Sequence, residues 1–298
     1  MKKKIIIFGG SGFIGLNLIE KLDKKKFNIT SVSRNKTLFA KKHKYINYIK
    51  CDVSNLKDIK KKINSEYDYI INLSGNIDHK NKNQTYKTHF FGLRNILNLF
   101  KKKKFKLFIQ AGSSLEYGNL KSPHSENKKT IPKSFYGKAK LKATNFILNL
   151  SKKEKIPFVV LRLYQVYGGH QKFDRLIPYV IKQSLSNKKF NCTNGIQYRD
   201  FLYVDDLSNL FKKILNKKKI KEGIYNVGTG QPLQVKKVID HIVNLTKKGK
   251  PLFGKIKMRN DEDAEYYPNI LKIKKSFNWK SKINIIDGLK KTIKFYEK

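Results

Sequence analysis

The segment Lys4-Ile-Ile-Ile-Phe8 runs directly into Gly9-Gly-Ser-Gly-Phe-Ile-Gly15, and apolar residues at helical spacing follow as far as Asp23. A buried strand, a glycine-rich turn and a helix in this order are typical of a dinucleotide-binding site. The glycines allow a tight turn and let the backbone approach a pyrophosphate, and the helix N-terminus faces that anion with free N–H groups. We therefore predict cofactor contacts in this turn, at Gly9, Ser11, Gly12, Phe13, Ile14 and Gly15.

The chain that follows alternates short apolar runs with helical patterns, which predicts parallel strands joined by crossover helices. We expect strands at 28–33, 45–49, 67–73, 106–111 and 157–163, and long helices at 83–103 and 133–153. From about Tyr167 onward, glycines and prolines punctuate shorter elements. The prediction is an α/β fold with two regions. A Rossmann-type doubly wound parallel sheet occupies residues 1–166, with strands returning from 198–227, and a smaller C-terminal substrate-binding region occupies 167–197 and 228–298.

The formal net charge of +44 on 298 residues suggests a nucleic-acid partner. However, six of the 66 basic residues are arginines, and the lysines are spread through every segment. Specific recognition of nucleic acid relies on bidentate arginines and stacked aromatic rings, which this composition does not concentrate. We therefore expect no specific nucleic-acid partner and favour compositional drift, because Lys, Asn and Ile are all abundant. Non-specific binding to polyanions at low salt follows from the charge in either case.

The composition also indicates in which cellular compartment the protein resides. No apolar run approaches the roughly 20 residues that span a bilayer, so we expect no membrane insertion. The basic start resembles a signal peptide, but its apolar stretch is too short. Two cysteines, Cys51 and Cys192, make a disulfide framework implausible and favour a reducing compartment. We predict a cytoplasmic protein. Its six histidines show no metal-ligand spacing, so no metal site is predicted.

Tyr136 and Lys140 stand four residues apart and therefore share one face of the predicted helix at 133–153. A nearby ammonium favours the phenolate of a tyrosine, so the pair can transfer a proton while hydride moves between substrate carbon and nicotinamide. Ser113 follows the predicted strand at 106–111, at the carboxyl edge of the sheet where ligands bind. We predict that Ser113, Tyr136 and Lys140 are the catalytic residues.

Cofactor choice depends on the residue after the second strand. An NAD site usually places a carboxylate there to hold the ribose hydroxyls, whereas this strand is followed by Arg34. A guanidinium there can pair with a ribose 2′-phosphate, which a carboxylate would repel. We therefore favour NADP(H) over NAD(H), with an ordinary surface arginine as the alternative.

Seven stretches together carry a family resemblance that covers nearly the whole chain. They are 51–53, 72–75, 113–118, 136–140, 161–168, 198–206 and 225–230. With them the chain resembles an extended short-chain dehydrogenase/reductase of the NAD-dependent epimerase/dehydratase family, which acts on nucleotide sugars. Within that family it looks like the CDP-abequose-synthase-like and dTDP-4-keto-6-deoxyhexose reductases. The resemblance implies a nucleotide-sugar substrate and a homodimer that pairs the two long helices across a two-fold axis.

The resemblance also implies individual roles. Asp52 and Val53 contact the adenine, and Leu73, Ser74 and Gly75 line the dinucleotide. Ser113 and Tyr136 hydrogen-bond the reacting sugar oxygen, and Lys140 binds the nicotinamide ribose. Arg199 clamps the substrate diphosphate, with Arg259 as a second candidate, and the remaining substrate contacts are Ser114 and Gln165. Gln165 and His89 stand where the family often has Asn, which puts contact details in doubt. Asp200 and Asp205 are expected to be structural caps.

The same resemblance bears on the reaction. Members that dehydrate sugars carry an Asp or Ser and then a Glu after the catalytic Ser or Thr; here these positions are Ser114 and Leu115. Leucine cannot transfer a proton, and Glu116 would point to the opposite side if the segment is extended. Dehydration is therefore disfavoured. We expect NADPH-dependent reduction of an NDP-4-keto-6-deoxyhexose for cell-surface polysaccharide, with an NAD-dependent 4-epimerase as the alternative. A non-catalytic NADP- or polyanion-binding protein is the alternative of another class.

Overall fold

The structure is a computed structural model that describes residues 1–34, 43, 45–76, 81–258 and 262–297. The chain divides into two compact units. Unit 1 contains residues 1–120, 128–163 and 212–225, and unit 2 contains 121–127, 164–211 and 226–298. Each unit is therefore assembled from segments that are distant in the sequence.

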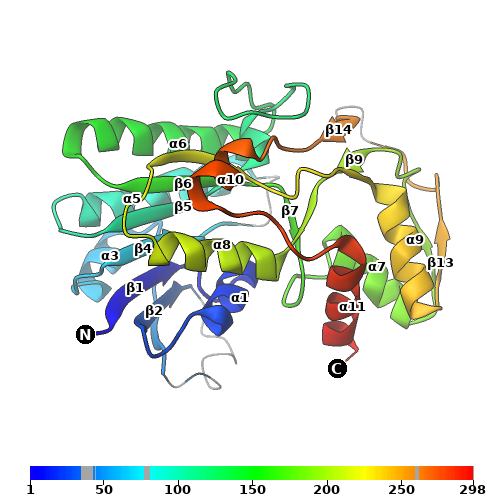
Figure 1. Cartoon of the computed structure of the whole chain (residues 1–298), viewed down its shortest axis with the longest axis horizontal. Helices are drawn as coiled ribbons and strands as arrows, with labels where there is room; N and C mark the ends of the chain where they lie inside the picture. Colours follow the sequence, from blue (N-terminus) through cyan, green and yellow to red (C-terminus); the bar gives the residue numbers. More distant parts are fainter. Residues whose placement is uncertain (35–42, 44, 77–80, 259–261, 298) are drawn as a thin grey trace. The chain divides into compact units, whose positions relative to one another are not determined.

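The largest sheet has seven strands (Figure 1). Its strands lie in the order β11-β6-β5-β4-β1-β2-β3, and the pairings from β6 to β3 are all parallel. The bounds are β1 Lys3–Phe8, β2 Phe27–Ser33, β3 Asn47–Lys50, β4 Tyr69–Asn72, β5 Leu107–Ser113, β6 Phe158–Leu163 and β11 Gly223–Val227. The strand order reverses at β1, which confirms the predicted doubly wound Rossmann-type sheet.

Both faces of this sheet are buried. Ile6, Phe8 and Phe108 belong to a large core cluster with side chains from α3 (Leu56–Lys62), α5 (Gly92–Phe100) and α6 (Phe135–Glu154). Because successive side chains of a strand point to opposite faces, Ile5 and Ile7 face the other way, and they too are fully buried. Leu16, Leu18 and Ile19 of α1 (Phe13–Lys21) are also buried. This burial explains the near-continuous apolar runs of the strands.

The helix expected at 83–103 is interrupted, which is a correction to the sequence-based prediction. It begins as α4 (Lys82–Tyr86), continues as a π-helical turn at Lys87–Phe91, and ends as α5. The wider turn is closed by the N–H of Gly92, which donates to the carbonyl of Lys87. Apolar spacing cannot reveal such a turn, because a single inserted residue leaves the pattern on either side intact. The second expected helix is continuous and forms α6.

Unit 2 is built from short elements. Three helices pack on one another: α7 Leu176–Leu185, α9 Val235–Thr246 and α11 Ile285–Tyr296 (Figure 1). Two small sheets pair β10 (Phe201–Tyr203) with β7 (Gln165–Tyr167) and β13 (Lys250–Leu252) with β8 (Lys189–Asn191). In a third, the central strand β9 (Tyr198–Arg199) pairs with β12 (Leu233–Gln234) on one side and β14 (Glu265–Tyr266) on the other. Helix α10 (Leu271–Phe277) also belongs to unit 2, whereas helix α8 (Val204–Asn216) begins in unit 2 and ends in unit 1.

Of the two strands expected to return to the large sheet, β11 does so, whereas β10 pairs with β7. The strand residues Phe201, Leu202 and Tyr203 are buried in that pairing, so their apolar character has another explanation. Among the residues that the structure describes, no helix is long and apolar enough to cross a membrane.

Candidate active site

The turn after β1 is closed by backbone contacts. Gly9 adopts a φ of +80°, and its N–H donates to the carbonyl of Val32 at 2.8 Å. A Cβ atom on Gly9 would lie 2.7 Å from the backbone of Leu73, and one on Gly15 would lie 2.5 Å from the carbonyl oxygen of Gly9. Glycine is therefore required at both positions, once for conformation and once for the close approach of helix α1 to the turn.

The N-terminus of α1 fits a dinucleotide phosphate. The N-cap is Gly12, which has no side chain to occupy the N–H groups of the first turn. A Cβ atom on Gly12 would meet the carbonyl oxygen of Gly9 at 3.2 Å and no other atom within 4 Å. Gly12 is exposed, and its neighbours Ser11, Phe13 and Ile14 are partly exposed. The residues present therefore match an anion held at a helix N-terminus.

A pocket of ≈ 250 Å³ opens beyond the ends of β2 and β3. Its lining residues are Arg34, Lys50, Cys51, Asp52, Asp58 and Lys62. Lys62 binds Asp58 at 2.7 Å, and this hydrogen bond lowers the pKa of the Asp58 carboxyl against the effect of its desolvation. Arg34 is exposed at the rim. The pocket thus presents a guanidinium where the second strand ends.

The predicted adenine and dinucleotide contacts have clear local roles. The Oδ1 atom of Asp52 accepts the N–H of Ser54 at 2.9 Å, which stabilises a local turn. Val53 is buried against Gly92, so its side chain belongs to the core. Ser74 donates to the side chain of Asn72, which fixes the loop of Leu73, Ser74 and Gly75 at the end of β4.

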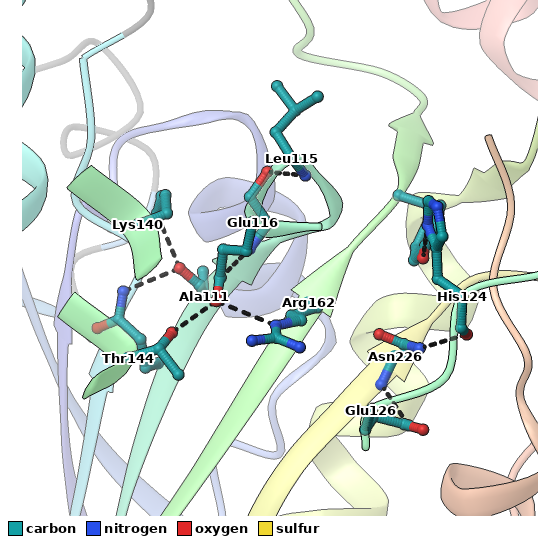
Figure 2. Close-up of polar contacts among 12 residues, drawn as sticks. Ala111, Leu115, Glu116, His124, Glu126, Lys140, Thr144, Arg162 and Asn226 are labelled. Atoms are coloured by element: carbon teal, nitrogen blue, oxygen red, sulfur yellow. Dashed lines mark hydrogen bonds and ion pairs between the residues drawn. The ribbon is translucent and has the colours of Figure 1, made fainter. Parts of the chain in front are cut away.

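Ser113 ends β5 and caps a short 3₁₀ helix at Ser114–Glu116. Its Oγ accepts the N–H of Leu115 at 3.2 Å, and its own N–H donates to Oε1 of Glu116 at 2.8 Å. This reciprocal capping box fixes the backbone of Ser113. The segment is therefore not extended, and Glu116 points inward while the Leu115 side chain points away from it (Figure 2).

Tyr136 and Lys140 lie on the first turns of α6, whose N-cap Ser134 accepts the N–H of Gly137 at 3.0 Å. The Lys140 amino group is buried, 5.7 Å from the centroid of the Tyr136 ring, and donates to the carbonyl of Ala111 at 2.7 Å (Figure 2). Burial lowers the pKa of Lys140 to about 8. The structure thus places the ammonium beside the tyrosine and anchors it to the strand that carries Ser113.

Comparison with models of protein families shows to which family the chain belongs. The model of the NAD dependent epimerase/dehydratase family matches residues 5–228. The chain belongs to this family. It is accordingly a nicotinamide-dependent enzyme, and the family resemblance predicted from the sequence is confirmed.

Relatives within the epimerase/dehydratase family span several activities. CDP-abequose synthase from Salmonella muenchen is 28% identical over 309 residues, which cover 100% of this chain and 99% of the relative. A mouse (Mus musculus) dTDP-D-glucose 4,6-dehydratase is 25% identical, and the match covers 99% of this chain and 89% of the relative. The structure of UDP-glucuronic acid 4-epimerase from Bacillus cereus, solved with UDP-glucuronic acid and NAD, matches with a TM-score of 0.89 and 24% identity. The match covers 99% of both chains, and at 24% identity it shows similarity of fold alone.

His89, which replaces an Asn common in the epimerase/dehydratase family, belongs to the π-helical turn. Its buried ring meets that of Tyr136 edge to face, with centroids 4.9 Å apart. The Nε2 atom lies 3.2 Å from the backbone nitrogen and oxygen of Asn76. A Cβ atom on Gly75 would approach the ring to 2.7 Å. His89 thus connects the dinucleotide loop with Tyr136.

The sequence did not predict a buried ion pair between Glu116 and Arg162 at this site. The Oε2 atom of Glu116 accepts from Nε of Arg162 at 3.0 Å and from the hydroxyl of Thr144 at 2.9 Å (Figure 2). Two features of the sequence point to it in hindsight. Glu116 is an acidic residue in a chain with few of them, and Arg162 is one of six arginines and stands inside a predicted buried strand.

The predicted substrate contacts fall in both units. Ser114 is buried beside Ser113 in unit 1, whereas Gln165 and Arg199 belong to unit 2. Gln165 is exposed. The Arg199 guanidinium is held by Glu262 and by the carbonyl of Tyr198. Arg259 lies outside the described residues.

Two polar clusters stabilise unit 2. Asp200 is fully buried and its carboxylate accepts the N–H groups of Thr229 and Gly230 and the Thr229 hydroxyl. These contacts agree with the structural cap expected for Asp200. Asn226 binds the carbonyl of His124 at 2.8 Å, and its N–H donates to Glu126 (Figure 2).

Proposed function

We propose that the protein catalyses the NADPH-dependent reduction of an NDP-4-keto-6-deoxyhexose to a deoxysugar nucleotide. The observation that carries the proposal is the arrangement of Tyr136, Lys140 and Ser113, in which a buried ammonium lies beside the phenol. The similarity to CDP-abequose synthase over the whole chain supports this reaction class. The product would enter cell-surface polysaccharide.

The proposed roles follow from the chemistry of the side chains. When bound, the nicotinamide supplies the hydride to C4 of the sugar. Tyr136 donates a proton to O4, and Ser113 hydrogen-bonds the same oxygen to stabilise its developing charge. Lys140 binds the nicotinamide ribose and favours the ionised form of Tyr136. Ser114 and Gln165 contact the sugar, and Arg199 and Arg259 hold the diphosphate.

The cofactor proposal is NADP(H) rather than NAD(H). Gly9, Ser11, Gly12, Phe13, Ile14 and Gly15 would hold the pyrophosphate at α1. Asp52 and Val53 would contact the adenine, and Leu73, Ser74 and Gly75 would line the dinucleotide. Arg34 at the rim of the pocket beyond β2 supports binding of a 2′-phosphate, because a guanidinium pairs well with phosphate.

Dehydration is disfavoured on the geometry of the 3₁₀ helix. The residue two positions after Ser113 is Leu115, which is 42% exposed and has no transferable proton. Glu116 is 0% exposed, and its carboxylate already accepts from Ser113, Thr144 and Arg162. This carboxylate is therefore engaged in the interior.

An NAD-dependent 4-epimerase is the second candidate, favoured by 28% identity with a putative UDP-glucose 4-epimerase from Methanocaldococcus jannaschii. One experiment separates the two. Purified protein is incubated with NADPH and a panel of CDP-, dTDP-, GDP- and UDP-4-keto-6-deoxyhexoses, and nicotinamide absorbance is followed. We expect loss of absorbance with at least one substrate. Inversion of an ordinary UDP-hexose at C4 with no net use of NADPH would establish the epimerase instead.

We further propose a cytoplasmic homodimer that pairs the segment 82–100 and helix α6 across a two-fold axis. Both cysteines, Cys51 and Cys192, are buried free thiols, which fits a reducing compartment. Phe91 is an exposed large apolar side chain on the first of these segments, and such residues are enriched at subunit interfaces. No specific nucleic-acid partner and no membrane insertion are part of the proposal.

A further inference from the structure

The Glu116 carboxylate is surrounded by donors from three elements. Oε1 accepts the backbone N–H of Ser113, and Oε2 accepts from Thr144 on α6 and from Arg162 on β6. Arg162 in turn stacks over the ring of Tyr117 at 4.6 Å. The three side chains Glu116, Thr144 and Arg162 are all buried and form a polar network inside the core, in which Nη1 of Arg162 has no hydrogen-bond partner among the described residues.

Such a network is not explained by stability alone. Taking two charges out of water costs several kcal/mol per ion, and a well-packed apolar replacement of a buried pair is often neutral or stabilising. The position of Glu116 is more informative than its stabilising effect. It bonds the N–H of Ser113, and a Cβ atom on Gly112 would lie 2.9 Å from its Oε1.

The charge of Glu116 also acts on Lys140. The Lys140 ammonium donates to the neutral carbonyl of Ala111, so that contact supplies no counter-charge. Burial lowers the pKa of Lys140, and the Glu116 carboxylate opposes this effect. The other titratable or charged groups around the pair are Tyr136 on the same helix, His89 from the π-helical turn against Tyr136, Tyr117 from the loop, and Arg162 from β6. Arg162 is positively charged and therefore opposes the effect of Glu116 on Lys140, and its Nε binds Glu116.

We propose that Glu116 is a positioning residue of the reaction, whose carboxylate fixes the backbone of Ser113 and whose charge keeps Lys140 in the ammonium form. Thr144 and Arg162 hold the carboxylate in place. The inference rests on the catalytic roles proposed for Ser113, Tyr136 and Lys140, and it assigns a function to a buried pair that takes no part in proton transfer.

The test separates the charge of Glu116 from its hydrogen bond. In Glu116→Gln the side-chain oxygen can still accept the N–H of Ser113, but the charge is lost. Because the Glu116 carboxylate raises the pKa of Lys140, the alkaline limb of the kcat profile should move to lower pH by about one unit when this charge is lost. In Glu116→Leu the hydrogen bond is lost as well, and kcat should fall at every pH. Affinity for the dinucleotide should stay unchanged in both.

Two further variants guard against a trivial loss of folding. Glu116→Gln leaves Arg162 buried without its carboxylate, so the double variant Glu116→Gln with Arg162→Gln removes both charges and should show a smaller shift in the same direction. Asp206→Asn is the matched control, because Asp206 is another buried carboxylate that accepts backbone N–H groups, from Lys282 and Ile283. It should lower thermal stability while the pH profile keeps its wild-type position.

A readout without substrate distinguishes this inference from the proposed reaction. Ultraviolet difference titration of wild type against Tyr136→Phe reports the ionisation of Tyr136 alone, and the same pair is compared in the Glu116→Gln background. Without the charge of Glu116 the Lys140 amine becomes neutral at lower pH and no longer favours the phenolate, so the phenolate of Tyr136 should appear at higher pH. If folded Glu116→Gln and double variants keep the wild-type titration and pH limb, the inference is wrong. Failure of every sugar substrate, with this titration shifted, would instead refute the proposed reaction.

Discussion

The amino group of Lys140 donates a 2.7 Å hydrogen bond to the carbonyl oxygen of Ala111, two residues before Ser113 in the same strand. This contact ties helix α6 to the end of β5. It also sets the burial of Lys140, whose side chain is nearly inaccessible to water. The position of the ammonium relative to Tyr136 is therefore fixed by the core of unit 1.

Reductive turnover should decrease above about pH 8. Burial lowers the pKa of Lys140 to about 8. At higher pH the amine therefore becomes neutral and no longer favours the ionised form of Tyr136. The ordinary pKa of a lysine is about 10.4, so the lowered value moves the loss of charge to lower pH. A profile of kcat against pH between 6 and 10 checks this, with about 8 as the expected midpoint of the limb. A flat profile through this range would contradict it.

Tyr136→Phe should nearly abolish turnover while leaving dinucleotide affinity almost intact. The substitution removes the hydroxyl that transfers the proton but keeps the ring that packs against His89. Loss of a positioned general acid costs about 10²–10⁴-fold in rate. Single-turnover kinetics and fluorescence titration of NADPH measure the two quantities separately. An active Tyr136→Phe variant would exclude Tyr136 as the proton donor.

Arg34→Ala should weaken NADPH binding more than NADH binding. Only NADPH carries the 2′-phosphate that the guanidinium can pair with at the rim of the pocket. Removing one charged hydrogen-bond partner should cost about 1.5–3 kcal/mol. Calorimetric titration of both cofactors against wild type and variant gives this difference. Equal losses for NADPH and NADH, or a wild-type preference for NADH, would refute the assignment.

Gly15→Ala should destabilise the protein more than Gly12→Ala. The new methyl group on residue 15 would lie 2.6 Å from the Cα atom of Gly10, so the turn and helix α1 would have to separate. Overpacking of this kind costs about 1–3 kcal/mol. At residue 12 the methyl group meets a single atom at 3.2 Å. Thermal unfolding of both variants provides the comparison, and equal midpoints would contradict the packing argument.

Phe91→Glu should convert the proposed dimer into monomers. A charge placed in a helical interface opposes its burial, whereas the side chain is exposed in the single chain and its replacement should leave the fold unchanged. Sedimentation equilibrium of wild type and variant measures the mass. A wild-type monomer would refute the dimer itself, and a dimeric Phe91→Glu variant would place the interface elsewhere.

The sheet could be predicted because its strands are apolar on both faces and the glycine turn follows the first of them. Ile5, Ile6 and Ile7 are all buried, so no alternation was needed to recognise the strand. The π-helical turn at Lys87–Phe91 could not be predicted, since it depends on the local hydrogen bonding of Gly92. The partner of β10 could not be predicted either, because three buried apolar residues fit any sheet equally well.

The site was predictable where residue type alone carries the chemistry, as for the pairing of Tyr136 with Lys140. It was not predictable where the path of the backbone decides. Glu116 was expected to point away only for an extended segment, and the 3₁₀ helix turns it inward to Arg162 instead. The contact between His89 and Tyr136 joins two helices, and no spacing within either helix reveals it.

The place of β11 in the sheet has a consequence for synthesis of the chain. Strand β6 ends at residue 163, but its outer neighbour β11 begins at residue 223. The ribosome must therefore add about 60 residues after β6 before β11 can cover the edge of β6. At usual rates of synthesis this takes several seconds. An uncovered edge strand is a template for pairing with other chains. Shortened products that stop between these two strands should aggregate, so the enzyme has to be made as one uninterrupted chain.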